Sequence, residues 1–414
     1  MPAADRLRPG TPADAGRHLA FLGHGAERTG PPILLGHLLR GLLAEGRGDR
    51  ASVVTARGGP LLDTYRAAGA EARAVATGRE PIEPVAAALR RAGGAALVAP
   101  AQAWARGRAV RRLADVDLVY VNAATPPTAA LLRALDPPPA TPVVLHVHEL
   151  DVGLRLTLDP VDLAFLLARA DHVIAASHPV AELLVAGHGV DPARTTRCDE
   201  FVDVGAVAPL PRPEARRRLG IPADAAVVGS VGLPDWRKDP ERLLHAAWLL
   251  RRTHPELDPW VAWIGGDPAS IDGRHLADEA RRLGMDHRFV HARHSERPDH
   301  LLGALDVFAL PAREDAFPLA ALEAGAAGLP LVCFRTGGVA GLADDGAGVA
   351  VEHPDVAAFA AALADLLGDA DRRATVGDRA RSLVAEHHDV PVGVARIRAV
   401  LDGVLARPAP TPGG

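Results

Sequence analysis

The sequence predicts an α/β protein made of two doubly wound, Rossmann-like domains that face each other across a central cleft. Short apolar, β-branched runs alternate with helix-length amphipathic segments almost throughout the chain. This alternation is typical of parallel sheets with crossover helices. Runs such as VVLHV and WVAWIGG are apolar without interruption, as expected of strands covered on both faces. The length of 414 residues suits two domains better than one.

The individual elements follow from these runs. In the first half we expect strands at His18–Gly23, Ala51–Ala56, Asp117–Asn122, Pro142–His148 and His172–Ser177. Helices are expected between them, at Pro32–Glu45, Pro127–Leu135 and Val161–Ala170. In the second half the expected strands are Ala226–Gly232, Trp260–Gly266, Arg288–Ala292, Asp306–Pro311, Leu329–Phe334 and Gly348–Glu352.

The domain boundary is expected near Val204–Arg216, where small residues accompany three prolines. Residues 17–205 would form the N-terminal domain, and residues 206–385 the C-terminal domain. A C-terminal helix is expected over 386–405, and disordered segments over 1–16 and 406–414, which are rich in Pro with Ala or Gly.

Composition excludes several classes of protein. The net charge of −5 gives no general attraction to nucleic acid. No signal peptide and no apolar run of about 20 residues is present. Cys198 and Cys333 lie in different halves, so we expect free thiols and a cytoplasmic protein. A basic stretch, Arg90–Arg112, leaves peripheral membrane contact open, although a solvated basic face is the simpler interpretation.

Neither a metal site nor a cofactor is expected. The histidines and cysteines show no clustered ligand spacing. Two Asp-x-Asp matches, Asp115–Asp117 and Asp369–Asp371, precede a strand and a helix, and we interpret both as capping residues.

The segment Leu310–Phe334 carries the most information. A strand is followed by a charged loop, and a helix is expected to start near Phe317 with Pro318 in its first turn. Glu323 lies in that helix among small apolar residues, where a carboxylate needs a partner such as the hydroxyls of a ribose. Asp315 would stand at the mouth of the helix. Alternatively, Asp315 is a helix cap and Glu323 a solvated surface charge.

A second loop carries two adjacent cations. The strand of VVGSVG ends at Gly232, and Arg237 and Lys238 precede a helix that begins at about Asp239. Lys238 is the only lysine in the chain. Two fixed cations can stabilise a departing diphosphate without a metal. The alternative is a pair of ordinary surface cations near a helix start.

These two segments resemble a known family, the family-4-type retaining glycosyltransferases of GT-B fold. Its loop P-S-x-x-E-G-F-G-L-x-x-L-E-A corresponds here to Pro311-Ala-Arg-Glu-Asp-Ala-Phe-Pro-Leu-Ala-Ala-Leu-Glu-Ala. The first acidic position is Asp315 instead of Glu, with Glu314 in reserve, in a variant R-E-D-x-F-P-L-x-x-L-E-A. In the family pattern G-R-L-x-x-x-K-G, the lysine falls on Lys238. Leu233 occupies the arginine position, and Arg237 would substitute for it.

The N-terminal half carries weaker matches. The loop in FLGHGAERTGPPILL resembles the family's first glycine loop, with Gly30 in place and Thr29 where a second glycine is usual. An ordinary strand-to-helix turn would also fit. The segment PVVLHVHELD resembles the family's H-x-H-E, which places the cleft histidine at His148. His146 would share a face with it but lie farther from the strand end.

The resemblance implies a metal-independent, retaining transfer of a hexosyl unit from a nucleotide-diphosphate sugar to a hydroxyl acceptor. The acceptor is unidentified and could be a glycan, a lipid-linked sugar or a small molecule. His148 and Asp315, with Glu314 in reserve, would be catalytic. The donor would be held in the C-terminal domain, with Glu323 on the ribose; the expected donor-binding residues are Gly30, Gly232, Arg237, Lys238, Phe317, Pro318, Leu319 and Glu323. Two alternatives stay open: a catalytically silent nucleotide-sugar-binding partner protein, and a sugar-nucleotide epimerase on the same fold.

Overall fold

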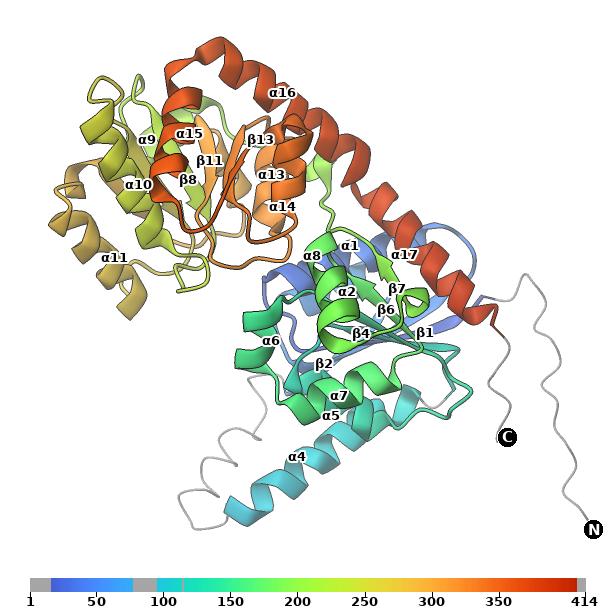
Figure 1. Cartoon of the computed structure of the whole chain (residues 1–414). Helices are drawn as coiled ribbons and strands as arrows, with labels where there is room; N and C mark the ends of the chain where they lie inside the picture. Colours follow the sequence, from blue (N-terminus) through green and yellow to red (C-terminus); the bar gives the residue numbers. More distant parts are fainter. Residues whose placement is uncertain (1–15, 77–94, 114, 408–414) are drawn as a thin grey trace, which may run out of the picture.

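The computed structural model describes residues 16–76, 95–113 and 115–407, and it contains two parallel sheets covered by helices on both faces (Figure 1). The first sheet has seven strands in the order β3-β2-β1-β4-β5-β6-β7, and the second has six in the order β10-β9-β8-β11-β12-β13. The predicted fold class, two doubly wound α/β domains, is therefore confirmed. The expected disordered ends fall almost entirely outside the described residues.

The N-terminal sheet is centred on β1 (His18–Gly23), which pairs with β2 (Arg50–Arg57) and β4 (Leu118–Asn122). β1 is an apolar run with five fully buried positions, as a central parallel strand requires. The other strands are β3 (Glu71–Ala76), β5 (Val143–Val147), β6 (His172–Ala175) and β7 (Thr195–Arg197). The helices are α1 (Gly30–Ala44), α2 (Leu61–Ala67), α4 (Ala95–Val110), α5 (Pro126–Leu135), α6 (Asp151–Thr157), α7 (Pro160–Arg169) and α8 (His178–Glu182).

The C-terminal sheet is centred on β8 (Val227–Val231) and β11 (Val307–Leu310), which pair in parallel. The other strands are β9 (Trp260–Ile264), β10 (Phe289–Ala292), β12 (Leu331–Phe334) and β13 (Gly348–Val351). The helices are α9 (Arg212–Leu219), α10 (Pro240–Thr253), α11 (Ile271–Arg282), α12 (Asp299–Leu302), α13 (Leu319–Ala326), α14 (Val339–Leu342), α15 (Val356–Gly368), α16 (Ala370–His387) and α17 (Val390–Leu405).

Two strands were missed by the sequence analysis, and both lie at edges of the N-terminal sheet. β3 reads EARAVA and β7 reads TTR, so neither is an uninterrupted apolar run. β7 has no fully buried position. An edge strand pairs on one side only, so its sequence carries less of the apolar signal that marks central strands.

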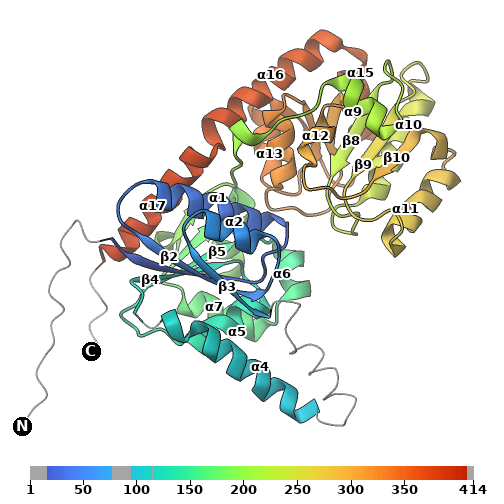
Figure 2. The same ribbon diagram turned by 180° about the vertical axis from the view of Figure 1, so that it is seen from behind.

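The last helix returns to the N-terminal domain (Figures 1 and 2). α17 packs against α1, and the two helices approach closely at Gly41, where a Cβ would lie 2.5 Å from Val394. Arg398 on α17 is buried, and its guanidinium forms ion pairs with Asp49 at 2.5 Å and Glu45 at 3.1 Å. The chain therefore crosses between the domains twice, once before α9 and once between α16 and α17.

Candidate functional site

The candidate site lies at the switch points of the two sheets. Chain order reverses between β8 and β11 in one sheet and between β1 and β4 in the other. Loops that follow such neighbouring strands diverge and leave a crevice at the carboxyl ends of the strands. The loops after β8 and β11 carry the predicted cations and carboxylates.

Three charged side chains from these two loops meet. Lys238 Nζ lies 2.5 Å from Asp315 Oδ2, and Arg237 Nη1 donates to the same oxygen at 2.9 Å. Lys238 and Asp315 are nearly buried, with side chains 12% and 10% exposed. The structure therefore brings Arg237, Lys238 and Asp315 into one cluster, as two cations around one anion.

The cluster depends on an unusual turn before α10. Asp239, which precedes Pro240, has a left-handed backbone with φ of 50°. Its buried carboxylate pairs with Arg242 at 2.6 Å and Arg313 at 2.9 Å, so it ties the β8 loop to the β11 loop. A backbone hydrogen bond from Arg313 N to Arg237 O reinforces this connection. An aspartate tolerates the left-handed region better than most residues.

The two cations determine the charge state of Asp315. Burial opposes ionisation of Asp315, but the charges and hydrogen bonds of Lys238 and Arg237 outweigh it and lower the pKa of this carboxyl. The cluster therefore carries a net charge of about +1, which suits an anionic ligand such as a diphosphate.

Glu323 is different, because no hydrogen bond or ion pair to its carboxylate is formed within the described part of the chain. Burial raises its pKa to about 7, and the charge of Asp299 adds to this effect while Arg297 opposes it. A half-buried carboxylate without a partner is costly. The site can offer this group to hydroxyl donors of a ligand.

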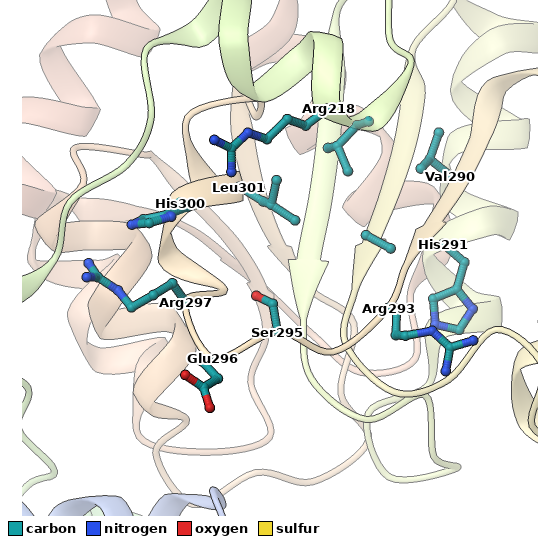
Figure 3. A pocket seen from close by; sticks show the side chains of 11 residues that line it. Arg218, Val290, His291, Arg293, Ser295, Glu296, Arg297, His300 and Leu301 are labelled. Carbon is teal, nitrogen blue, oxygen red and sulfur yellow. The ribbon is translucent and has the colours of Figure 1, made fainter.

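An open pocket of about 610 Å³ lies in the C-terminal domain. Arg297, whose charge acts on Glu323, is one of its lining residues. Figure 3 shows Arg218, Arg297 and His300 toward one end of the pocket, and His291 and Arg293 toward its other end. The size of the pocket fits a nucleoside.

Glu314 does not join the cation cluster. Its carboxylate reaches the N-terminal domain and accepts hydrogen bonds from Val152 N at 2.9 Å and Gly153 N at 2.7 Å. These amides begin α6, where backbone N–H groups have no partner within the helix. Glu314 therefore connects the two domains directly beside Asp315.

His148 lies just beyond β5, and its Nδ1 is 2.6 Å from Glu200 Oε1. Burial opposes charge on His148, but the charge and hydrogen bond of Glu200 outweigh it and raise the pKa of the imidazole. His146 lies two residues earlier, within β5, and is fully buried. Its Nδ1 lies 2.6 Å from the Tyr120 hydroxyl. Burial holds the pKa of His146 well below its usual value.

His146, His148 and Glu200 could each offer one ligand atom within 4.8 Å of one another. However, the 2.6 Å contact between His148 Nδ1 and Glu200 Oε1 is a hydrogen bond. Two ligand atoms about 2.1 Å from one tetrahedral ion would lie about 3.4 Å apart. In this structure the trio is therefore arranged as a hydrogen-bonded group.

The remaining predicted residues lie at strand ends and helix starts of the two domains. Phe317 is buried and packs on His388, with ring centroids 5.0 Å apart. Pro318 is extended, with ψ of 126°, so α13 begins at Leu319 and the expected start near Phe317 is wrong by two residues. Gly232 follows β8 with φ of 155°, and a Cβ there would lie 3.4 Å from the Lys238 side chain. Gly30 begins α1 and has open space around it.

Sequence reasoning missed three residues of this region. Glu200 precedes the domain crossing and belongs to no motif, and Arg297 lies in a loop without a pattern. Ala123 follows β4 at the N-terminal switch point with φ of 121°. A strained non-glycine residue at such a place is typical of functional sites. An alanine gives no sequence signal for this conformation.

Both halves of the chain match known protein families. Residues 211–383 match the model for glycosyl transferases group 1, and residues 30–206 match the model for glycosyltransferase family 4. Each domain belongs to a glycosyltransferase family, and the chain has the GT-B fold.

Several curated proteins that are similar to this chain are named D-inositol 3-phosphate glycosyltransferase. D-inositol 3-phosphate glycosyltransferase 2 of Catenulispora acidiphila is 34% identical over 256 residues, 58% of this chain and 60% of the relative. D-inositol 3-phosphate glycosyltransferase of Geodermatophilus obscurus is 35% identical over 270 residues, 60% of this chain and 59% of the relative. The matches thus span about three fifths of the length of these relatives.

Solved structures share the fold of this chain. Anabaena HepE in complex with UDP-glucose superposes with a TM-score of 0.73 and 18% identity, over 94% of this chain and 100% of that one. Sucrose-phosphate synthase from Thermosynechococcus elongatus gives a TM-score of 0.73 and 19% identity, over 94% of this chain and 99% of that one.

Across the described residues, no helix has the length and apolar character needed to cross a bilayer.

Proposed function

We propose that this chain is a retaining, metal-independent hexosyltransferase that uses a nucleotide-diphosphate sugar. The observation that carries the proposal is the pairing of a cation cluster with a half-buried carboxylate that has no partner among the described residues, both beside one switch point. Lys238 and Arg237 supply the charge for a diphosphate, and Glu323 supplies the acceptor for ribose hydroxyls. The base would occupy the pocket that Arg297 lines.

The transfer step follows from the charges. The bond between the sugar C1 and the diphosphate oxygen breaks, and the acceptor hydroxyl forms its new bond to C1 on the same face. The hydroxyl proton passes to the departing phosphate oxygen, while Lys238 and Arg237 stabilise the charge that develops there. His148 and Asp315 would orient the sugar.

If the anomeric configuration is retained, the positions of three carboxylates favour the same-face route over a covalent intermediate. Asp315 is held by two cations, and Glu314 is held by the amides of α6. Glu323 would contact the ribose. None of these three is free beside the expected sugar position to act as a covalent nucleophile.

The relatives suggest candidates for both substrates. HepE was solved with UDP-glucose, and the curated relatives are named for D-inositol 3-phosphate. We therefore propose UDP-hexoses as first donors and inositol phosphate as first acceptor to be tried. A cytoplasmic location is proposed from the two buried free cysteines, Cys198 and Cys333.

The deciding experiment is calorimetric titration of the protein with UDP-, GDP-, ADP- and dTDP-sugars, with and without EDTA, followed by product analysis with D-inositol 3-phosphate. Saturable binding of one nucleotide class, unaffected by EDTA, with transfer of the sugar and retained anomeric configuration would support the proposal. Binding without transfer or donor hydrolysis would favour a silent partner protein. A new nucleotide sugar formed without acceptor would favour an epimerase, and absence of binding would overturn the proposal.

A further inference from the structure

A line of buried polar groups runs through the N-terminal domain and ends at the cleft histidine. The Tyr120 hydroxyl lies 2.6 Å from His146 Nδ1. The rings of His146 and His148 are 3.9 Å apart between centroids, and His148 Nδ1 is 2.6 Å from Glu200 Oε1. The side chains of His148 and Glu200 are only 3% and 6% exposed. Such a network is costly to bury, and the donor cluster of the other domain does not account for it.

The hydrogen bonds determine which nitrogen of each ring is committed. Glu200 accepts from His148 Nδ1–H, so this nitrogen keeps its proton. His148 Nε2 is buried and has no hydrogen-bond partner among the described residues. The imidazole therefore turns Nδ1 toward Glu200 and leaves Nε2 for another group.

Several neighbouring groups act on the charge of His148. Glu200 and Glu149 favour the imidazolium, whereas burial opposes it. Burial lowers the pKa of His146 and of His24, and the charge of His148 lowers both further. His146 and His24 therefore stay neutral, whereas His148 is paired with the carboxylate of Glu200. The positive charge is concentrated on His148.

Glu200 itself is fixed by the second crossing between the domains. His388 Nδ1–H donates to the Glu200 carbonyl at 2.9 Å. Val202 N donates to His388 O at 2.9 Å, and Val390 N donates to Val202 O at 3.0 Å. The backbone of Glu200 is therefore held by the α16–α17 junction, and its carboxylate is a rigid support for His148.

We propose that Glu200 is a positioning residue for glycosyl transfer, which holds the His148 imidazole with Nδ1–H committed and Nε2 directed at the donor sugar. The inference rests on the proposed function, because His148 matters only if a sugar occupies the cleft. Glu200 acts through His148 and does not touch the substrate. It would therefore affect the transfer step without affecting binding of the nucleotide, whose proposed contacts lie in the other domain.

The test compares Glu200→Gln with the neighbouring Asp199→Asn. The second variant removes a charge that is paired with Arg197 and keeps the hydrogen bond between His148 and Glu200. We expect Glu200→Gln to lower kcat by about tenfold or more, with nucleoside-diphosphate affinity within about twofold of wild type. Loss of the carboxylate lowers the pKa of His148, so the alkaline limb of the kcat profile should move to lower pH. Asp199→Asn should leave both properties unchanged.

A second readout does not depend on turnover. Nuclear magnetic resonance titration of the histidines, with the His148 signal identified by its loss in His148→Gln, gives the pKa of His148 directly. We expect a value above the usual 6.5 in wild type and a lower value in Glu200→Gln. A wild-type pKa of His148 at or below 6.5 would overturn the role of Glu200. An active Glu200→Gln variant whose alkaline limb of the kcat profile stays in place would do the same. Neither result would bear on the proposed function. A wild-type protein that binds no nucleotide sugar would overturn the proposed function, and this inference with it.

Discussion

The ammonium of Lys238 and the guanidinium of Arg237 converge on one oxygen of Asp315. The two cations are not equivalent, because the side chain of Lys238 is 12% exposed and that of Arg237 is 35% exposed. The buried position takes the compact ammonium, and the wider guanidinium lies nearer to solvent. This difference explains why the single lysine of an arginine-rich chain stands at this position.

Replacement of Lys238 should therefore harm donor binding whichever residue is introduced. We expect Lys238→Ala to weaken nucleotide-sugar affinity about ten- to hundredfold, through loss of a charge-assisted hydrogen bond. Lys238→Arg should recover only part of this loss, because a planar fork does not fit the enclosed space. Calorimetry measures both affinities, with Arg282→Ala on the exposed face of α11 as the control. Full recovery by Lys238→Arg would contradict the argument.

Glu323 predicts a pH dependence of donor binding. Its pKa of about 7 lies above the ordinary 4.5, so at neutral pH about half of the molecules carry it protonated. Ribose hydroxyls donate to the ionised form, so affinity should fall as pH is lowered from 8 to 6. The fall is at most about tenfold per pH unit. Glu323→Gln should bind more weakly and show no such dependence.

Titration with a nucleotide sugar measures this effect cleanly, because its diphosphate diester does not titrate between pH 6 and 8. Calorimetry at pH 7 in two buffers of different ionisation enthalpy should also detect protons released on binding. A wild-type affinity that is constant from pH 6 to 8 would show that Glu323 does not contact the ligand.

At the scale of elements, α17 is fitted to the N-terminal domain by its small residues. A Cβ at Gly393 would lie 2.0 Å from the Phe201 ring, whereas nothing lies within 4 Å of one at Gly403 on the same helix. The buried ion pairs of Arg398 lie between these two glycines. The contact at Gly393 is therefore specific to one face of the helix.

The two glycines form a matched pair for a stability measurement. Gly393→Ala should lower the free energy of unfolding by about 1–3 kcal/mol, because the new methyl group overpacks Phe201. Gly403→Ala should raise it by roughly 0.5–1 kcal/mol, since alanine favours the helix and meets no neighbour. Urea denaturation measures both changes. Equal effects in the two variants would show that α17 does not pack on Phe201 as described.

For the whole molecule, Glu314 links the relative position of the domains to the donor cluster. Its two hydrogen bonds to the start of α6 are made by the residue next to Asp315. A movement that separates the domains must break these bonds while the cluster itself can stay intact. The link therefore favours the arrangement of the two domains seen in this structure.

Removal of this link should open the protein without damaging the donor site. We expect Glu314→Ala to shift the equilibrium toward the open form by about 1.5–3 kcal/mol, the value of a hydrogen bond to a charged group. Small-angle scattering should show a larger radius of gyration, and kcat should fall while nucleoside-diphosphate affinity holds. Glu352→Ala, at an exposed carboxylate, is the control. An unchanged radius together with unchanged kcat would exclude the link.

The sequence by itself determined most strands of the two sheets and the two loops that carry the charged residues. Uninterrupted apolar runs predict buried parallel strands, and chain position alone puts Lys238 and Asp315 just after two of them. Adjacent strands β8 and β11 then bring these two residues together. The sequence also indicated that Glu323 needs a partner or a ligand, because its neighbours in the helix are small and apolar.

Only the tertiary structure decided which distant residues meet. Glu200 is 52 positions from His148, and Glu314 is about 160 positions from the amides of α6. Each contact depends on strand order, on the edge strand β7 or on the way in which the two domains face each other. Hydrophobic periodicity records whether a side chain is buried and not which polar group it meets. For that reason the sequence could place His148 at the cleft but could not find the carboxylate that orients it.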